Sequence, residues 1–378
     1  MNIAVVNETG STESRVALMP ESVQKLVAAK ASVSIESGAG LGAARTDDDY
    51  ESAAAEIVSD RNALLARADV LVTVNRPSAD DFQKLKKGAV VLGFLRPLDE
   101  PAKLTPALEN GLTTFSMELV PRITRAQAMD ALSSMATVAG YKAVLLGADR
   151  IPRMFPLLMT AAGTVPPARV LVLGAGVAGL QAIATARRLG AVVEAYDVRA
   201  AAGEQVRSLG AKFLEVDLGG IQTEDKGGYA VELSPEALQR GRDLIAEQAK
   251  SADVIITTAQ VPGRRAPVLM DENAVNGMKR GSIVIDLAGA TGGNVTLSKP
   301  DENVERNGVT VLAPTNLPAT VPVHASQLYS RNVTSFLTLL IKDGELHVDM
   351  EDNIVGPSCV THEGKWMNQR VAAAMGAT

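Results

Sequence analysis

The sequence predicts an α/β protein with two doubly wound domains separated by a cleft. Short apolar runs alternate with helical stretches along most of the chain, and this alternation favours parallel sheets with right-handed crossovers. A glycine-rich turn at residues 174–179 lies between an apolar run and a helix, as in the first crossover of such a sheet. The chain has 378 residues, and at roughly 150 residues per domain this length predicts two domains.

The N-terminal third contains apolar runs of strand length that alternate with helical stretches. In residues 20–30, Val23, Leu26 and Val27 share one face of a helix, at spacings of three and four residues. The predicted strands are residues 2–6, 32–36, 70–74 and 89–94, and a second predicted helix covers residues 53–66. This third of the chain therefore favours one parallel sheet.

A long alanine-rich helix separates this series from a second one. It follows a polar loop at residues 122–127, runs through Tyr141 to Leu146, and could connect two domains. The Pro-containing residues 163–167 then lead into further apolar runs. The predicted strands are residues 170–173, 192–196, 212–216, 254–257, 282–287 and 309–312, enough for a complete doubly wound domain of roughly six strands.

The C-terminal segment is too short to form a core of its own. It offers one amphipathic stretch at residues 325–341 and weak strand patterns over residues 346–360. We expect it to pack on the first domain. The predicted division is a discontinuous first domain of residues 1–131 with 321–378, and a second domain of residues 132–320.

Composition excludes several classes of protein. The chain has 37 Lys and Arg against 43 Asp and Glu, a net charge of −6, which is not the basic footprint of a nucleic-acid-binding protein. No apolar run reaches the roughly 18–20 residues that span a bilayer, and the N-terminus does not read as a signal peptide. The single cysteine, Cys359, excludes an intramolecular disulfide and indicates a reducing compartment. We expect a soluble, cytoplasmic protein.

The glycine-rich turn has the pattern of a dinucleotide-binding site. Gly174 permits the tight turn, Gly176 lets the backbone approach a pyrophosphate, and Gly179 lets the helix lie close to the strand. Asp197 ends the next strand about 20 residues further on, where it would accept hydrogen bonds from a ribose and repel a 2′-phosphate. This favours NAD(H) over NADP(H) and a Rossmann-like domain, although Arg199 could meet a phosphate. The predicted cofactor-binding residues here are Gly174, Ala175, Gly176, Val177, Ala178, Gly179, Asp197, Val198 and Arg199.

Two more loops follow strands of the second series. Residues 288–294 come after Asp286, and residues 260–264 come after the strand at 254–257. Ligands bind at the carboxyl ends of parallel strands, so each loop is equally well a cofactor wall or a plain connection. As a wall, the carboxyl ends of these two strands and the loops that follow would contribute Thr258, Ala259, Gln260 and Leu287.

No metal site or acid–base pair is visible in the sequence. His324, His347 and His362 are too scattered for a metal site. Cys359 has no cation beside it in the sequence, so we expect a buried thiol.

Several stretches resemble the soluble NAD(H)-binding domain I of proton-translocating nicotinamide nucleotide transhydrogenase, in the alanine dehydrogenase/transhydrogenase family. The specific ones are residues 159–169 running into 174–181, and residues 121–130 continuing to 134. Weaker matches lie at residues 14–17, 227–230 and 358–361. The resemblance covers essentially the whole chain, and it implies two Rossmann-like domains.

Alanine dehydrogenase shares this fold and is the alternative. Its pattern has a lysine and a histidine that hold and protonate a keto acid, and an acidic residue before a Gly-Gly pair. The matching positions here are Asn75, Arg96 and Ala290, although Arg15 could still bind a carboxylate. Oxidising an amino acid moves a proton and needs an acid–base group, whereas hydride transfer between two nicotinamides needs positioning and water exclusion. A non-catalytic NAD-binding module is a further alternative.

The resemblance also implies residue roles and partners. Arg122, Gln127, Asp130 and Ser133 would hold the nicotinamide, and a glycine-rich mobile loop carrying Tyr229 would close over the nucleotide. Bound NADH would pass a hydride to NADP⁺ on an NADP(H)-binding beta subunit, coupled to proton translocation by a membrane subunit. The chain would be a homodimer in the cytoplasm, peripheral to the inner face of the cell membrane through its partners.

Overall fold

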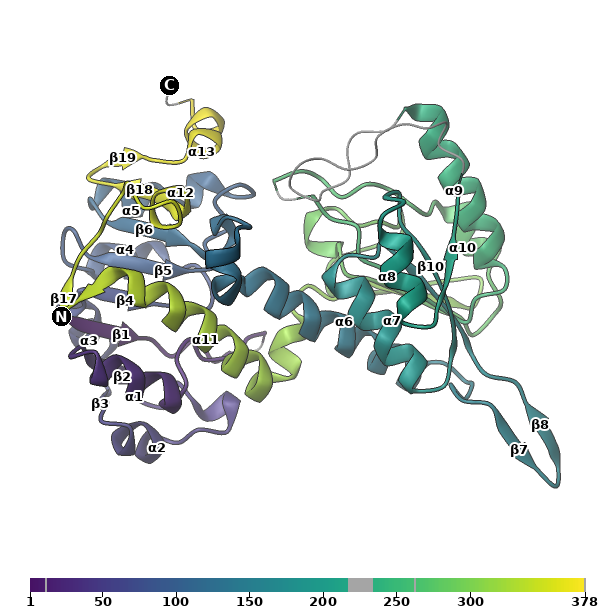
Figure 1. The fold of residues 1–378 in the computed structure, drawn as a ribbon, viewed down its shortest axis with the longest axis horizontal. Helices are drawn as coiled ribbons and strands as arrows, with labels where there is room; N and C mark the ends of the chain where they lie inside the picture. Colours follow the sequence, from purple (N-terminus) through teal and green to yellow (C-terminus); the bar gives the residue numbers. More distant parts are fainter. Residues whose placement is uncertain (11, 217–233, 262, 377–378) are drawn as a thin grey trace. The chain divides into compact units, whose positions relative to one another are not determined.

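The structure is a computed structural model that describes residues 1–10, 12–216, 234–261 and 263–376. These residues form two compact units (Figure 1). The first unit comprises Met1–Met135 and Pro318–Thr378, and the second comprises Ala136–Leu317. Each is built on a sheet of mainly parallel strands, which confirms the predicted α/β fold class.

The first unit has an eight-stranded sheet in the order β19-β18-β6-β5-β4-β1-β2-β3. Strands β1 to β6 are parallel in a doubly wound order, whereas β18 pairs antiparallel with β6 and β19 antiparallel with β18. The strands are β1 (Asn2–Val5), β2 (Ser32–Glu36), β3 (Glu56–Val58), β4 (Val70–Val72), β5 (Val90–Gly93), β6 (Thr113–Ser116), β18 (Cys359–His362) and β19 (Lys365–Trp366). The C-terminal segment thus extends the sheet that the N-terminal third begins.

Helices and a small ribbon surround this sheet. The longest helix, α11 (Pro322–Leu340), buries Tyr329 and Phe336 completely, and the ring of Phe336 lies 5.4 Å from that of Phe115 on β6. The other α-helices are α1 (Pro20–Ala28), α2 (Asp47–Ser52), α3 (Arg61–Arg67), α4 (Ala79–Lys84), α5 (Thr105–Glu109), α12 (Val355–Ser358) and α13 (Gln369–Ala374). Short 3₁₀ turns are η1 (Leu41–Ala43), η2 (Pro101–Leu104), η3 (Met117–Leu119), η4 (Thr124–Met129) and η6 (Leu317–Thr320), and the ribbon pairs β16 (Ile341–Lys342) with β17 (Glu345–Leu346).

The single helix predicted over residues 53–66 is wrong. Strand β3 lies in the middle of that stretch, with α2 before it and α3 after it. Ala54 has a φ of 66°, a left-handed conformation that ends the run after α2. Asp60 starts α3 by accepting hydrogen bonds from the backbone N–H groups of Asn62, at 2.9 Å, and Ala63, at 3.2 Å. Because this stretch is rich in alanine, its sequence pattern does not show that the helix is interrupted before and after β3.

The second unit has a seven-stranded sheet in the order β11-β10-β9-β12-β13-β15-β14. Its strands are β9 (Arg169–Leu173), β10 (Val192–Tyr196), β11 (Lys212–Leu214), β12 (Val254–Thr257), β13 (Ile283–Asp286), β14 (Asn303–Arg306) and β15 (Val309–Leu312). All pairings are parallel except that of β14 with β15, an edge pairing that the sequence did not predict. The helical segments are α7 (Val177–Arg188), α8 (Ala202–Ser208), α9 (Pro235–Ala249), α10 (Glu272–Asn276) and η5 (Gly289–Thr291).

Helix α6 (Ala131–Arg150) runs across the division between the two units. By length and composition alone it could cross a membrane, which corrects the expectation that no segment is long and apolar enough. Its residues Ala143 and Val144 are fully buried in the core of the second unit. Gly140 meets the start of α7 so closely that a Cβ there would lie 2.1 Å from the carbonyl oxygen of Ala178.

An antiparallel hairpin projects from the second unit (Figure 1). It consists of β7 (Leu158–Thr160) and β8 (Gly163–Val165), where the sequence predicts only a connection. Both strands are exposed, and their apolar side chains are Leu158, Met159 and Val165, of which Met159 is 72% exposed. The hairpin contributes little to the core of its own unit.

Candidate functional site

The turn between β9 and α7 has the geometry that the glycine pattern predicts. Gly174 has a φ of 100°, in the left-handed region, and its N–H donates to the carbonyl oxygen of Tyr196 at 2.8 Å. A Cβ at Gly179 would lie 1.8 Å from the carbonyl oxygen of Gly174. The first turn of α7 is therefore pressed against the end of β9, as the tight strand–turn–helix connection requires.

Gly176 differs from its two neighbouring glycines, because a Cβ there would meet no heavy atom within 4 Å. Its φ of −76° is open to any residue, so backbone conformation does not require a glycine. Helix α7 begins at Val177, whose side chain is 41% exposed, and no side chain caps the helix. The first turn of α7 thus has no side-chain cap and lies beside open space at Gly176, which suits an anionic group such as a pyrophosphate.

Asp197 lies directly after β10 and is already fully hydrogen-bonded. Its carboxylate accepts the N–H of Ala175 at 2.7 Å and the backbone N–H of Arg199 at 2.8 Å. The Arg199 side chain donates twice more, from Nε at 3.0 Å and Nη2 at 2.9 Å. The sequence raised Arg199 as a possible phosphate ligand; here its guanidinium neutralises Asp197. A ribose hydroxyl would displace one of these donors, and the Arg199 side chain is the one with a path to solvent.

The loops after β12 and β13 are joined by side-chain hydrogen bonds. Asn294 binds both backbone groups of Ala259, accepting the N–H at 3.0 Å and donating to the carbonyl oxygen at 2.8 Å. Gln260 donates to the carbonyl oxygen of Leu287 at 2.6 Å, and Thr258 donates to that of Gly174 at 3.0 Å. Strands β10, β9, β12 and β13 are neighbours. The predicted residues that follow them are therefore brought to one edge of the sheet, where such folds bind ligands.

Asp286, at the end of β13, holds this edge together. Its side chain is fully buried, and its two carboxylate oxygens accept five hydrogen bonds. The donors are the hydroxyls of Thr257 and Ser298 and the backbone N–H groups of Ala288, Asn294 and Val295. The sequence singles out Asp286 only for its position at the end of a strand. It gives Asn294 no role of its own, because the contact of Asn294 with Ala259 joins residues that are 35 apart in the chain.

The predicted nicotinamide residues lie in the first unit, around η4. Gln127 and Arg122 are both exposed. Asp130 accepts the backbone N–H of Ser133 at 2.8 Å and its hydroxyl at 2.6 Å, so it caps the start of α6. The structure therefore joins Asp130 and Ser133 directly and gives them a helix-capping role that the sequence analysis did not foresee.

A buried polar cluster occupies the carboxyl ends of β1 and β4 in the first unit. Arg15, only 5% exposed, is bound by both oxygens of Glu13 at 2.8 and 2.6 Å. Asn75, at the position of the alanine dehydrogenase lysine, donates to Glu13 at 2.9 Å. Burial opposes ionisation of Glu13, but the hydrogen bond and charge of Arg15 outweigh it and lower its pKa to about 2. The acid next to Arg15 is thus an anion that competes with an added carboxylate.

Glu8 belongs to the same cluster, although no pattern in the sequence singles it out. Burial raises its pKa to about 7, although the N–H groups of Val74 and Asn75 donate to its oxygens at 2.6 and 2.7 Å. Arg96 points elsewhere, toward Asp99 and Glu100 at 3.6 and 3.8 Å. Ala290 lies exposed in η5 of the second unit. Among the departures from the alanine dehydrogenase pattern, only Asn75 joins the cluster.

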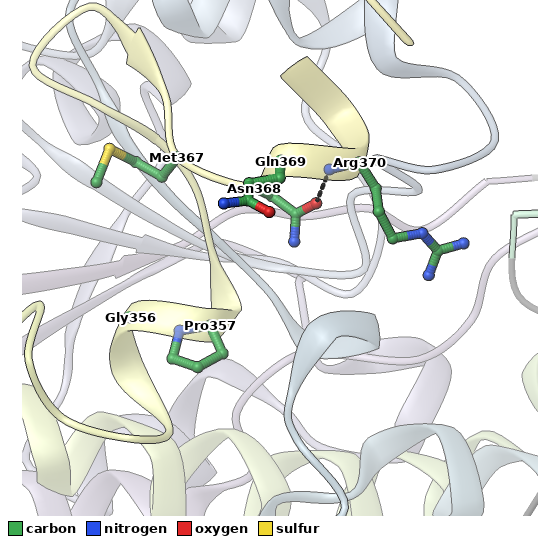
Figure 2. A pocket seen from close by; sticks show the side chains of 6 residues that line it. All are labelled: Gly356, Pro357, Met367, Asn368, Gln369 and Arg370. Carbon is green, nitrogen blue, oxygen red and sulfur yellow. Dashed lines mark hydrogen bonds between the residues drawn. The ribbon is translucent and has the colours of Figure 1, made fainter. Parts of the chain in front are cut away.

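One surface hollow of about 420 Å³ lies in the C-terminal segment of the first unit (Figure 2). It is lined by Gly356, Pro357, Met367, Asn368, Gln369 and Arg370. Asn368 turns inward to cap α13, accepting the backbone N–H of Arg370 at 3.1 Å. None of the predicted site residues lines this hollow. Tyr229 and the glycine-rich stretch around it lie outside the described residues.

Within the described residues no group of three or more His, Cys, Asp or Glu could hold a metal ion. Cys359 is buried, as expected, and burial raises its pKa to about 12. The predicted site residues thus form two groups, one at the edge of the sheet in the second unit and one at a polar turn in the first unit.

Comparison with known proteins identifies this combination of domains. The family model "Alanine dehydrogenase/PNT, N-terminal domain" matches residues 4–139, and "Alanine dehydrogenase/PNT, C-terminal domain" matches residues 143–369. The crystal structure of transhydrogenase from Sinorhizobium meliloti is similar with a TM-score of 0.87 and 43% identity, covering 97% of this chain and 100% of that one.

Relatives of both kinds are similar over nearly their whole length. Over 372 residues the chain is 47% identical to the first part of the NAD(P) transhydrogenase alpha subunit of Rhodospirillum rubrum, covering 96% of this chain and 97% of that protein. It is 30% identical to alanine dehydrogenase of Mycobacterium tuberculosis over 383 residues, covering 100% and 97%. The chain therefore belongs to the alanine dehydrogenase/PNT family, and it resembles this transhydrogenase subunit more closely than this alanine dehydrogenase.

Proposed function

We propose that the chain is the NAD(H)-binding alpha component of a proton-translocating nicotinamide nucleotide transhydrogenase. The observation that carries this proposal is the turn at Gly176, where open space meets the uncapped start of α7 next to Asp197. The higher identity to the Rhodospirillum subunit, 47% against 30% for the alanine dehydrogenase, favours hydride exchange between nucleotides over amino-acid oxidation.

Different groups of the chain would bind different parts of the dinucleotide. The N–H groups at the start of α7, with the backbone of residues 174–179, would bind the pyrophosphate. Asp197 would accept a ribose hydroxyl once the Arg199 side chain gives up one oxygen. Val198 would contribute backbone at the same strand end, and Thr258, Ala259, Gln260 and Leu287 would form the opposite wall. Tyr229 would close over the nucleotide, as the resemblance implies.

Hydride transfer between two nicotinamides requires little acid–base chemistry from the protein. Reduced nicotinamide, when bound, supplies the hydride. Arg122, Gln127, Asp130 and Ser133 would orient the ring and exclude water, and no side chain has to move a proton at the reacting carbons. The buried Glu13–Arg15 pair, which leaves little room for a keto acid's carboxylate, supports this reading over an alanine dehydrogenase.

The proposal includes partners. NADP(H) would be bound by a separate beta subunit, and a membrane subunit would couple the exchange to proton translocation. The chain itself would lie in the cytoplasm, peripheral to the inner face of the membrane. The hairpin of β7 and β8 supports a homodimer, because exposed apolar side chains such as Met159 are typical of a surface that a second copy covers.

One assay separates the proposed function from its alternatives. The chain is mixed with a purified NADP(H)-binding component, and NADH-dependent reduction of an NADP⁺ analogue is followed. The proposal predicts transfer above background. Alanine-dependent reduction of NAD⁺ by the chain alone, without such transfer, would instead establish the alanine dehydrogenase alternative. A non-catalytic NAD-binding module would bind NADH in a titration and show neither activity.

Replacing Asp130 by asparagine tests the nicotinamide end. We expect slower hydride transfer with largely unchanged NADH affinity. The asparagine side chain would keep one capping oxygen for the backbone N–H of Ser133, while it loses the charge and the second acceptor oxygen, which binds the Ser133 hydroxyl. Stopped-flow transfer rates and NADH titration measure the two effects separately. A variant that transfers hydride at the parent rate would remove Asp130 from the proposed machinery.

Replacing Asp197 by alanine tests the proposed contact with the ribose. In contrast to Asp130→Asn, this variant should first of all bind NADH more weakly. NADH affinity should fall about tenfold or more, since a charge-assisted hydrogen bond contributes roughly 1.5–3 kcal/mol. Calorimetric titration with NADH gives the dissociation constant. An unchanged dissociation constant would contradict the proposed contact with the ribose.

A further inference from the structure

The 3₁₀ turn η4, which carries Gln127, is anchored on two of its three sides. Side chains three residues apart line up along a 3₁₀ helix. Ala126 and Met129 form one row and are buried, 1% and 6% exposed. Gln127 lies on a different row and is exposed. The remaining row contains Arg125 and Ala128. The side chain of Arg125 and the backbone carbonyl of Ala128 both bind residues from the C-terminal part of the chain.

Arg125 makes the stronger of these two contacts. Its Nη2 lies 2.6 and 2.5 Å from the two oxygens of Asp352 and 2.6 Å from Oδ1 of Asn353. We call these three residues the Arg125 clamp. The hydrogen bond from Arg125 is the main reason why the pKa of Asp352 falls to about 2, so the pair is charged at neutral pH. In the second contact, Asn332 of α11 donates a hydrogen bond to the carbonyl oxygen of Ala128 at 2.8 Å.

Asp352 is itself fixed to the core of the first unit. Its Oδ1 also accepts the backbone N–H groups of Ile354 at 2.7 Å and Val355 at 3.1 Å, immediately before and at the start of α12. α12 leads directly into β18, and β18 pairs with β6 in the sheet. A short and rigid path therefore runs from the sheet to the outer face of η4.

We propose that Arg125 is a positioning residue. By fixing the orientation of η4 about its own axis, it would keep Gln127, Arg122 and Asp130 directed toward the nicotinamide. The inference rests on the proposed function and goes beyond it, since neither Arg125 nor Asp352 is among the residues assigned to the nucleotide. The Arg125 side chain is 50% exposed, so the clamp contributes to orientation and hardly to stability.

The test uses the full chain with the NADP(H)-binding component. Arg125→Ala should slow hydride transfer by about tenfold, because small misplacements of a reacting group are costly, while the NADH dissociation constant stays within about twofold. Arg125→Lys should restore part of the rate. The matched control is Arg67→Ala, which removes a comparable exposed pair with Glu56, 3.1 Å apart in the same unit. A transfer rate for Arg125→Ala equal to that of Arg67→Ala would overturn the proposal.

A second readout does not depend on activity. Cys359 is the only cysteine of the chain and is buried, so a nitroxide label on Gln127→Cys would report η4 alone. Its spectrum should show greater mobility with Arg125→Ala and no change with Arg67→Ala. Equal label mobility in all three backgrounds would refute the clamp even if hydride transfer were absent from the parent chain. Absent transfer together with the expected mobility change would instead refute only the proposed function.

Discussion

Replacing Gly179 by alanine is expected to destabilise the second unit by about 3 kcal/mol, the upper end of ordinary overpacking. The new Cβ would lie 1.8 Å from the carbonyl oxygen of Gly174 and 3.4 Å from the Thr258 hydroxyl. Backbone cannot yield as a flexible side chain does, so α7 must move away from β9. Urea unfolding followed by circular dichroism measures the change in the free energy of unfolding.

Gly176→Ala is the matched control three residues earlier. Its Cβ would meet nothing within 4 Å, and the φ of −76° suits alanine. The free energy of unfolding should therefore change by less than about 0.5 kcal/mol. NADH affinity should nevertheless fall, because the methyl group fills the space that the turn leaves for a pyrophosphate. A Gly176→Ala variant that binds NADH as the parent does would refute this use of the open space, and an equally stable Gly179→Ala would refute the packing argument.

Asp286→Ala should be comparably severe, with a loss of about 4 kcal/mol. Five donors would lose their acceptor in a fully buried site, and each buried donor left unsatisfied costs about 1–3 kcal/mol before water or rearrangement compensates. Thermal or urea unfolding gives the loss. Amide exchange should quicken first at Ala288, Asn294 and Val295, whose N–H groups bind the carboxylate.

Two further variants test whether lost hydrogen-bond acceptors cause the destabilisation in Asp286→Ala. Asp286→Asn should also destabilise, because its NH₂ group would face N–H or hydroxyl donors whichever way the amide turns. Asp243→Ala removes an exposed carboxylate with a local partner, Gln239, at 2.8 Å, and should change stability by less than about 0.5 kcal/mol. An Asp286→Asn variant as stable as the parent would show that the carboxylate's second acceptor oxygen is dispensable.

What the sequence predicted well is local in the chain. Gly174, Gly176 and Gly179 lie within one turn of each other, and the tight turn, the open space and the close approach are all present. Strands with long apolar runs, such as residues 254–257 for β12, were predicted at their true bounds. In these places the local pattern and the tertiary structure favour the same conformation.

What the sequence missed depends on partners far away in the chain. β6 is rich in threonine and has no apolar run, yet the Thr114 hydroxyl binds that of Thr361 on β18, 247 residues later. Asn294 gains its importance only because the loop holding Ala259 lies beside it. The pairing of Arg199 with Asp197 is local, but a sequence cannot distinguish a phosphate ligand from the counter-ion of a neighbouring carboxylate.

The discontinuous first unit has a consequence for the order of folding during synthesis. The second unit, Ala136–Leu317, is one continuous stretch, whereas the first unit needs α11 and β18 from the last part of the chain. Ribosomes add about 5–20 residues per second. For several seconds after the second unit has emerged, the edge of β6 and the apolar surface later covered by α11 therefore await their partners. The nascent first unit is then the part of the chain most exposed to aggregation and to chaperone binding.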